Sequence, residues 1–193
     1  MKLAIFVDIQ NIYYTTRDTF NRSFNYKSFW KKIESTGEIV RANAYAIDKG
    51  DDRQQKFQYA LRSIGFSVKL KPYISRIDGS TKGDWDVGIT IDILDSAQEV
   101  DKIILLSGDG DFDLLVRKVI DQHECTVDVY GVQELTSYSL IKSGVIKNKI
   151  LLICADTHSK LVDKNNKNLL PVVGDGCSCI FISKNKENNF YYN

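Results

Sequence analysis

The stretch Lys102–Phe112, K-I-I-L-L-S-G-D-G-D-F, decides the fold of this chain. Its apolar residues Ile103–Leu106 are typical of a short strand that is buried on both faces of a parallel sheet. The strand runs into glycines that allow a sharp turn, and Asp109 and Asp111 lie in that turn. Ligands of open α/β sheets bind outside the carboxyl ends of the strands. The stretch therefore predicts a parallel sheet with a ligand site at its edge.

Strands and helices alternate on both sides of this stretch. Further strands are predicted over residues 2–7, 38–47, 66–74 and 125–130, and helices over 11–19, 27–34, 51–64, 86–97, 112–122 and 135–142. This alternation is typical of parallel strands that are joined by right-handed crossovers. We therefore expect an α/β domain with a mostly parallel central sheet over residues 1–146. The pattern weakens over residues 147–193, an extension whose order stays open and which holds candidate strands at 149–155 and 179–183.

The composition is that of a globular protein of ordinary size. The 193 residues are 43% hydrophobic and 26% charged. No stretch is long enough to cross a bilayer, and the apolar N-terminus meets Asp8 too early for a signal peptide, so we expect a cytoplasmic protein with no membrane partner. The 26 basic and 25 acidic residues give a net charge of +1, so any basic surface must be local. The four cysteines lack zinc-site spacing and favour reduced, buried thiols.

Carboxylates gather where the predicted strands end. Asp8 ends the first strand, Asp109 and Asp111 follow the fourth, and Asp84 and Asp86 open the helix before it. If the first and fourth strands are neighbours at the switch point of a doubly wound sheet, Asp8, Asp109 and Asp111 share one crevice. Crowded carboxylates repel one another, and Mg²⁺ or Mn²⁺ relieves that repulsion. Such ions can generate a hydroxide nucleophile and neutralise the charge of a phosphodiester.

A simpler alternative is that these residues cap helices. Single aspartates that follow strands often do so, and Asp86 and Asp111 are open to this interpretation. Asp92 and Asp113 fit solvated helix faces equally well. The capping alternative is weaker for the whole set, because three separate segments are expected to converge on one edge of the sheet.

Four motifs resemble those of one protein family. They are F-V-D-I-Q-N (Phe6–Asn11), K-G-D-W-D-V-G-I-T-I-D (Lys82–Asp92), S-G-D-G-D-F (Ser107–Phe112) and V-Y-G-V-Q-E-L-T-S (Val129–Ser137). In this order they resemble the NYN domain, specifically the LabA-like (DUF88) branch of the PIN-like nuclease superfamily, over residues 1–146. The resemblance implies a PIN-like three-layer α/β/α sandwich. It also implies a nuclease site that depends on Mg²⁺ or Mn²⁺ and acts mainly on RNA.

The resemblance also implies roles for individual residues. The expected metal ligands match the acidic motifs of the family, and they are Asp8, Asp86, Asp109 and Asp111. Asn11 matches the asparagine that helps to arrange the site. Weaker candidates, in supporting roles, are Asp84, Asp92 and Ser107. Asp92 lies six residues beyond Asp86, on a different face of the predicted helix, and is for that reason a weaker candidate for a direct ligand.

Basic and aromatic residues near this site are candidates for RNA contacts. Lysine and arginine side chains around the third strand and the loop after it would hold phosphates, and they are Lys69, Lys71, Arg76 and Lys82. Aromatic side chains would stack on unpaired bases, and they are Tyr13, Tyr14 and Tyr73. The alternatives are lysines that are simply solvated and tyrosines that line the edge of the core.

These observations favour a divalent-metal-dependent endoribonuclease that hydrolyses phosphodiester bonds of single-stranded or structured RNA. The alternative is a catalytically weak RNA-binding or regulatory module that keeps the fold and a metal site. Phosphoryl transfer to an aspartate would need a second aspartate two residues after Asp8, where the chain has Gln10. The sequence is compatible with a homodimer but does not show one.

Overall fold

A five-stranded, all-parallel sheet with the strand order β3-β2-β1-β6-β7 organises the protein. The computed structural model describes residues 1–48, 50–72 and 84–145, and the backbone of short strands within 74–75, 81–82, 150–154, 178–184 and 190–192. The strands of the main sheet are β1 (Lys2–Asp8), β2 (Glu38–Asp48), β3 (Ser67–Pro72), β6 (Lys102–Leu106) and β7 (Thr126–Tyr130).

The central strand β1 pairs with β2 on one side and with β6 on the other. The chain runs outward from β1 through β2 to β3 and then returns to β6 and β7. The winding direction therefore reverses between β1 and β6, which makes this pair the switch point of the sheet. The prediction that the first and fourth strands are neighbours is confirmed.

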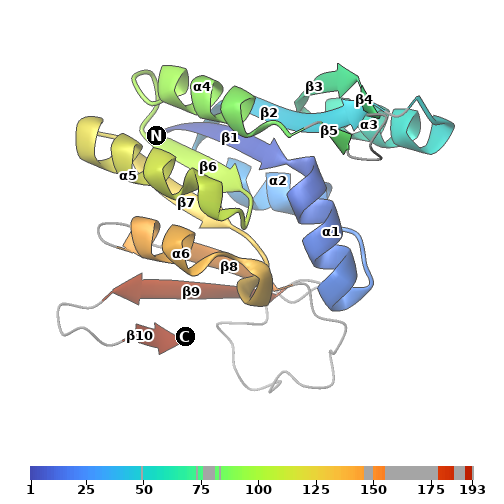
Figure 1. The fold of residues 1–193 in the computed structure, drawn as a ribbon. Coiled ribbons are helices and arrows are strands. Elements are labelled where there is room, and N and C mark those ends of the chain that lie inside the picture. The colour runs from blue at the N-terminus through green and yellow to red at the C-terminus, as the bar shows by residue number, and fades with distance from the viewer. Residues whose placement is uncertain are drawn as a thin grey trace.

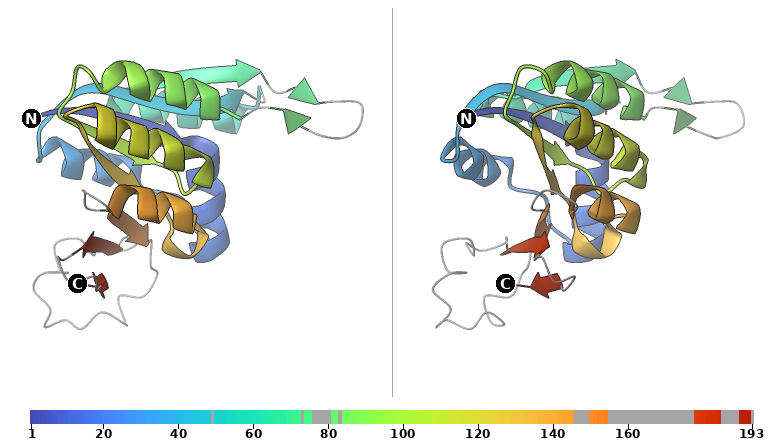
Figure 2. Two further views of the ribbon diagram at one scale, coloured as in Figure 1. Left: turned by 60° about the vertical axis from the view of Figure 1, so that its left-hand side comes forward. Right: turned by 90° about the vertical axis from the view of Figure 1, so that its left-hand side faces the viewer.

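Helices cover both faces of the sheet (Figures 1 and 2). One layer holds α1 (Ile9–Phe20), α2 (Tyr26–Glu34) and α3 (Asp52–Ile64), and the other holds α4 (Asp86–Ser96), α5 (Asp113–Gln122) and α6 (Tyr138–Val145). Strand β1 shows how the sequence specifies both layers. Its residues Leu3, Ile5 and Val7 pack against the first group of helices, whereas Ala4 and Phe6 pack against the second. All five are fully buried, and the predicted three-layer α/β/α sandwich is confirmed.

The third strand is shorter than predicted. It ends at Pro72, and two short strands, β4 (Ile74–Ser75) and β5 (Thr81–Lys82), pair antiparallel where the sequence predicts the end of the strand and a loop. Proline has no N–H to continue a ladder, which accounts for the end of this edge strand. The pair β4–β5 lies beyond the main sheet (Figure 2).

The candidate strands after residue 146 are also present. They are β8 (Ile150–Cys154) and β9 (Ser178–Lys184), which form a separate antiparallel sheet with β10 (Phe190–Tyr192). No helix within the described residues is both long enough and apolar enough to cross a membrane.

Candidate acidic site at the switch point of the sheet

Parallel pairing of β1 with β6 brings Asp8 and Ser107 out of the sheet side by side. Val7 is in register with Leu106, so the next residue of each strand lies at the same edge. The Ser107 hydroxyl, on a fully buried residue, lies 3.5 Å from Oδ2 of Asp8. The other carboxylate oxygen of Asp8 accepts a hydrogen bond of 3.1 Å from the Asn11 backbone N–H and caps α1. Asp8 is thus fixed by the start of the helix that follows it.

The S-G-D-G-D loop is fastened to this first segment. The side-chain carbonyl of Asn11 accepts a hydrogen bond of 2.8 Å from the Gly108 N–H. Within the loop, Ser107 Oγ accepts from the Asp109 N–H at 3.2 Å. Asp109 in turn caps the 3-10 helix η1 (Gly110–Phe112) by accepting from the Asp111 N–H at 3.0 Å. Capping thus engages one oxygen, Oδ1, of each of the two carboxylates Asp8 and Asp109.

These contacts correct the capping alternative considered for the sequence. Asp86 and Asp111 were the candidate caps, but neither caps a helix. Trp85 occupies the N-cap position of α4 and Phe112 that of α5, and neither helix has a side-chain cap. The residues that cap are Asp8 and Asp109. A cap needs its carboxylate one residue before the first helical turn, which sequence spacing locates only to within a residue or two.

A third segment supports the loop from the other side, and its role was not predicted. The Ser137 N–H donates to the Gly108 carbonyl at 2.9 Å. A Cβ at Gly110 would lie only 2.6 Å from Ser137 Oγ, and one at Gly108 would lie 3.0 Å from Thr136 Oγ1. Both glycines are therefore needed for close approach of the L-T-S segment. The signals in the sequence are the glycines beside Asp109 and the motif Val129–Ser137, which ends in this segment, but neither predicts the contact.

Asp86 is the first residue of α4, in the helical layer opposite to α1, and it interacts with the carboxylates of Asp8 and the S-G-D-G-D loop. Partial burial raises the pKa of Asp86 to about 6, and the charges of the surrounding carboxylates contribute, in the order Asp8, Asp84, Asp109 and Asp111. Burial also raises the pKa of Asp8, against the effect of the Asn11 N–H, and the charge of Asp109 raises it further. Four predicted ligands from three segments therefore interact electrostatically at one edge of the sheet.

The donor chemistry of this edge fits a hard divalent cation. Its side chains offer carboxylate, amide and hydroxyl oxygens, the ligands that Mg²⁺ and Mn²⁺ prefer. The mutual repulsion that raises the pKa of Asp86 is what a bound cation would remove. In the described residues, no three acidic, histidine or cysteine side chains close around a common point that would hold a metal ion. The chemistry therefore suits the ion, whereas the side chains are not drawn together into a coordination shell.

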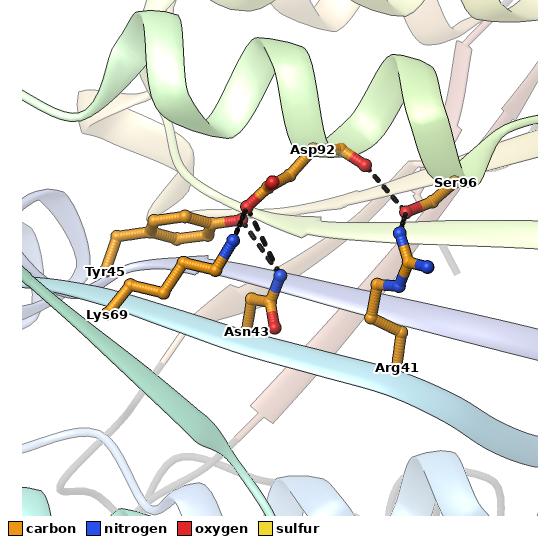
Figure 3. Close-up of polar contacts among 6 residues, drawn as sticks. All are labelled: Arg41, Asn43, Tyr45, Lys69, Asp92 and Ser96. Carbon is orange, nitrogen blue, oxygen red and sulfur yellow. Dashed lines mark hydrogen bonds and ion pairs between the residues drawn. The ribbon is translucent and has the colours of Figure 1, made fainter.

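Asp92 lies away from this set, in a polar network between α4 and the sheet (Figure 3). Its carboxylate accepts hydrogen bonds from the Tyr45 hydroxyl, from Lys69 Nζ at 2.5 Å and from Asn43 Nδ2 at 3.3 Å. Burial alone would raise the pKa of Asp92, but the bonds from Lys69 and Tyr45 lower it overall. Asp92 thus holds α4 to β2 and β3, and Lys69 is engaged there and not directed to a substrate.

The other residues that the sequence predicts to contact RNA or support the site lie in different parts of the structure. Lys71 lies beside the acidic edge, where Nζ donates to the Asp84 carbonyl at 2.7 Å and sits 4.4 Å from the centre of the Trp85 ring. The Asp84 side chain is exposed. Tyr13 and Tyr14 are partly exposed on α1, at 42% and 49%. Arg76 and Tyr73 lie outside the described residues, and only the backbone is described for Lys82.

Most of the chain is similar to known proteins. The family model of the NYN domain matches residues 2–147, more than half of the chain. A structure of a protein of unknown function from Vibrio parahaemolyticus is 49% identical with a TM-score of 0.72, and the match covers 78% of this chain and 91% of that one. The low amplitude and bright protein LabA of Synechococcus elongatus is 32% identical over 123 residues, which are 58% of this chain and 64% of LabA.

The C-terminal part has a second similarity. The family model of 3-oxoacyl-[acyl-carrier-protein] synthase III matches residues 120–192, which overlap the end of the NYN match. A putative 3-oxoacyl-[acyl-carrier-protein] synthase 3 of Campylobacter jejuni is 43% identical over 68 residues, 35% of this chain but only 18% of that protein. The chain thus spans less than two thirds of the curated relatives that it matches.

The fold, the acidic motifs and the comparisons agree on the larger part of the chain. The parallel sheet places the first-strand aspartate beside the S-G-D-G-D loop, as the motif order predicts. The match to the NYN model spans all of these elements, and the match to the Vibrio structure covers 78% of the chain at 49% identity. The chain therefore belongs to the NYN domain family, in the LabA-like branch of the PIN-like nuclease superfamily.

Proposed function

We propose that the protein is a divalent-metal-dependent endoribonuclease. The observation that carries this proposal is the electrostatic coupling of Asp86 to Asp8, Asp109 and Asp111 across the switch point of the sheet. Carboxylates gathered at a ligand-binding edge destabilise the fold unless a cation neutralises them. Membership of a nuclease superfamily makes an RNA phosphodiester the substrate that best suits such a cation.

The acidic residues at the edge of the sheet would bind the metal. Asp8, Asp86, Asp109 and Asp111 would hold one or two Mg²⁺ or Mn²⁺ ions. Bound there, the metal would supply a nucleophilic hydroxide and charge to stabilise the phosphodiester in the transition state. With a pKa raised to about 6, Asp86 is mostly ionised at neutral pH and would be available to a cation there.

Asn11 would act as a positioning residue. Its side-chain carbonyl is taken by the Gly108 N–H, so it orients the loop that carries Asp109 and does not contact the substrate through that oxygen. Lys71 would attract the RNA backbone from beside Asp84, next to the metal site. Residues 1–146 would form the nuclease domain, and residues 147–193 would form an extension to it.

Cleavage of labelled single-stranded RNA by the full chain tests the proposal. We expect internal cleavage with Mn²⁺ or Mg²⁺ and none with EDTA. Asp109→Asn should lose at least about a hundredfold in rate, as expected for loss of a key charge-stabilising group. Asparagine caps a helix as well as aspartate does, so this change removes the charge and keeps the cap. Asp18→Asn, at the far end of α1, is the matched control, and full activity of Asp109→Asn would contradict the proposal.

A second candidate function is an RNA-binding module with little turnover. The observation in its favour is that Asp8 and Asp109 both cap helices, so the fold itself needs them whether or not the protein is an enzyme. Single-turnover assays with enzyme in excess separate the two functions. An endoribonuclease converts the bound RNA to shorter products when Mn²⁺ is added. A binding module retains it intact, with Asp109→Asn binding as tightly as wild type.

A further inference from the structure

A cavity of about 740 Å³ opens between α1, the segment that leads into α2, and the start of α3. Its volume lies in the range of roughly 300–1,000 Å³ in which proteins bind small organic ligands. The lining combines aromatic rings, among them Tyr14, Tyr26 and Phe57, with polar and charged side chains such as Gln10 and Arg53. None of the residues proposed to hold the metal lines it, so it is separate from the acidic site.

The cavity nevertheless adjoins that site. Ile9 and Gln10, the two residues that follow Asp8, form part of its wall. Tyr26 lines it as well, and the pKa of Tyr26 is raised first by burial and then by the charge of Asp8. A ligand in the cavity would therefore lie next to any phosphodiester held at the acidic edge.

Aromatic rings in the cavity wall pack against one another. Phe24 packs edge-on against Tyr26 with ring centres 4.8 Å apart, and Tyr26 packs against Phe57 at 5.7 Å. Tyr14, also in the lining, stands edge-on to Tyr13 at 5.3 Å, and Arg17 donates to the Tyr13 hydroxyl at 2.6 Å. Such fixed rings provide stacking surfaces for a flat ligand without a large loss of side-chain entropy.

The cavity also offers polar groups to a ligand. The Tyr26 hydroxyl and the Gln10 side-chain amide both belong to residues of its lining. They can donate hydrogen bonds to, and accept them from, polar groups on the edge of a ligand.

The charges at the cavity favour a neutral ligand over a phosphate. Asp51 and Asp52 both line it, against one cationic side chain, Arg53. Carboxylates repel phosphates but accept hydrogen bonds from the ring and exocyclic N–H groups of bases. A flat, uncharged heterocycle with donors and acceptors on its edge suits both the rings and these polar groups.

We propose that this cavity receives one unpaired base of a single-stranded RNA whose backbone passes over the acidic edge. The proposal rests on the proposed nuclease function and deepens it by naming the cavity where an unpaired base of the substrate binds. It implies that a base must leave its stack before the adjacent phosphodiester is cleaved, so duplex RNA is a poor substrate. Binding of the base does not require the metal.

Binding in EDTA tests this inference separately from catalysis. The probe is a fluorescein-labelled ten-nucleotide single-stranded RNA, followed by anisotropy with the full chain. Tyr14→Ala removes a stacking surface, and Tyr26→Phe removes only the buried hydroxyl while keeping its ring. Tyr59→Ala is the matched control, because Tyr59 is 73% exposed on α3 and does not line the cavity. The same variants are titrated with a strand of equal length in which all bases are replaced by abasic sites.

We expect Tyr14→Ala to weaken binding of the intact strand at least about fivefold, the effect of losing one stacked base. Tyr26→Phe should weaken it to a smaller extent, and Tyr59→Ala should have no effect. The abasic strand should bind weakly and equally to all variants. Equal affinities for Tyr14→Ala and Tyr59→Ala, tight binding of the abasic strand, or no binding of the intact strand would each overturn the proposal. Absence of cleavage with Mn²⁺ would overturn only the nuclease function.

Discussion

Asn11 and Gly108 are 97 residues apart in the chain and are joined by a hydrogen bond of 2.8 Å from the Gly108 N–H to the Asn11 side chain. This bond ties the start of α1 to the loop that carries Asp109. It therefore connects the two strands of the switch point on the side where the acidic residues lie.

Asn11→Ala should leave the Gly108 N–H without its partner. We expect a loss of about 1–3 kcal/mol in the free energy of unfolding, the usual cost of such a group. Hydrogen exchange of the Gly108 amide should accelerate, and RNA cleavage should fall at least about tenfold.

Asn25→Ala is the control for Asn11→Ala. Asn25 caps α2 by accepting from the Ser28 N–H at 3.0 Å, away from the acidic residues. It should cost about 1 kcal/mol of stability with unchanged cleavage and unchanged exchange at Gly108. Equal loss of activity in the two variants would mean that stability, and not the position of the loop, limits activity.

Asp86→Asn should stabilise the metal-free protein at pH 7.5. The pKa of Asp86 is raised to about 6 in the folded protein from an ordinary value of 3.8. Folding therefore favours the protonated form, so the contribution of Asp86 to stability is largest below about pH 4 and is lost as the pH rises through 6. The variant cannot ionise and should melt at a higher temperature in EDTA at pH 7.5, with the difference vanishing near pH 4.

Adding Mn²⁺ should reverse that order at pH 7.5. The wild type should gain more in melting temperature than Asp86→Asn, because only it keeps all the carboxylates of the site. Asp95→Asn, on an exposed part of the same helix, is the control and should follow the wild type under all conditions. A destabilised Asp86→Asn in EDTA would contradict the electrostatic description of the site.

Asp92→Asn should have the opposite pH dependence. The pKa of Asp92 is lowered overall, because the bonds from Lys69 and Tyr45 outweigh its burial. Such a carboxylate stabilises the fold above its unfolded pKa of about 3.9 and loses this effect as the pH falls through its folded pKa. We expect the variant to lose about 1–2 kcal/mol at pH 7, a moderate value because Lys69 is partly exposed. Denaturant titrations at pH 7 and pH 3 would measure this, and an equal loss at both would contradict it.

Gly110→Ala should disturb the acidic loop through its contact with Ser137. The added Cβ would lie 2.6 Å from Ser137 Oγ and 3.0 Å from its Cβ. We expect lower stability and lower cleavage, both partly restored in the double variant Gly110→Ala/Ser137→Gly, because the second change removes both clashing atoms. A double-mutant cycle measures this coupling. Additive losses would show that the clash is not the cause.

Much of the fold follows from local patterns in the sequence. Apolar runs and helical spacing place the five strands of the main sheet, and the acidic residues lie at strand ends because ligand sites of α/β folds form there. Topology then predicts that Asp8 and Asp109 share one edge, since a switch point places the first strand beside the fourth. Membership in the family rests on motifs that are themselves local.

Long-range contacts are what the sequence leaves undetermined. The contact of Ser137 with Gly110 depends on how α6 packs, and no periodicity encodes that distance. Lys69 looks like a phosphate ligand in the sequence, but β3 places it under α4, within reach of Asp92. Tyr26 has no distinguishing neighbours in the sequence, and its position beside Asp8 results from the packing of α2 on the sheet.

The central claim is that Asp8, Asp86, Asp109 and Asp111 hold a divalent metal against an RNA phosphodiester. The most direct measurement is a crystal structure of the full chain with Mn²⁺ and a single-stranded RNA whose linkages are non-hydrolysable phosphorothioates. We predict an anomalous manganese peak within about 2 Å of oxygens of Asp8 and Asp109 and of one RNA phosphate. Manganese absent from this edge, or RNA bound on a different surface, would contradict the claim.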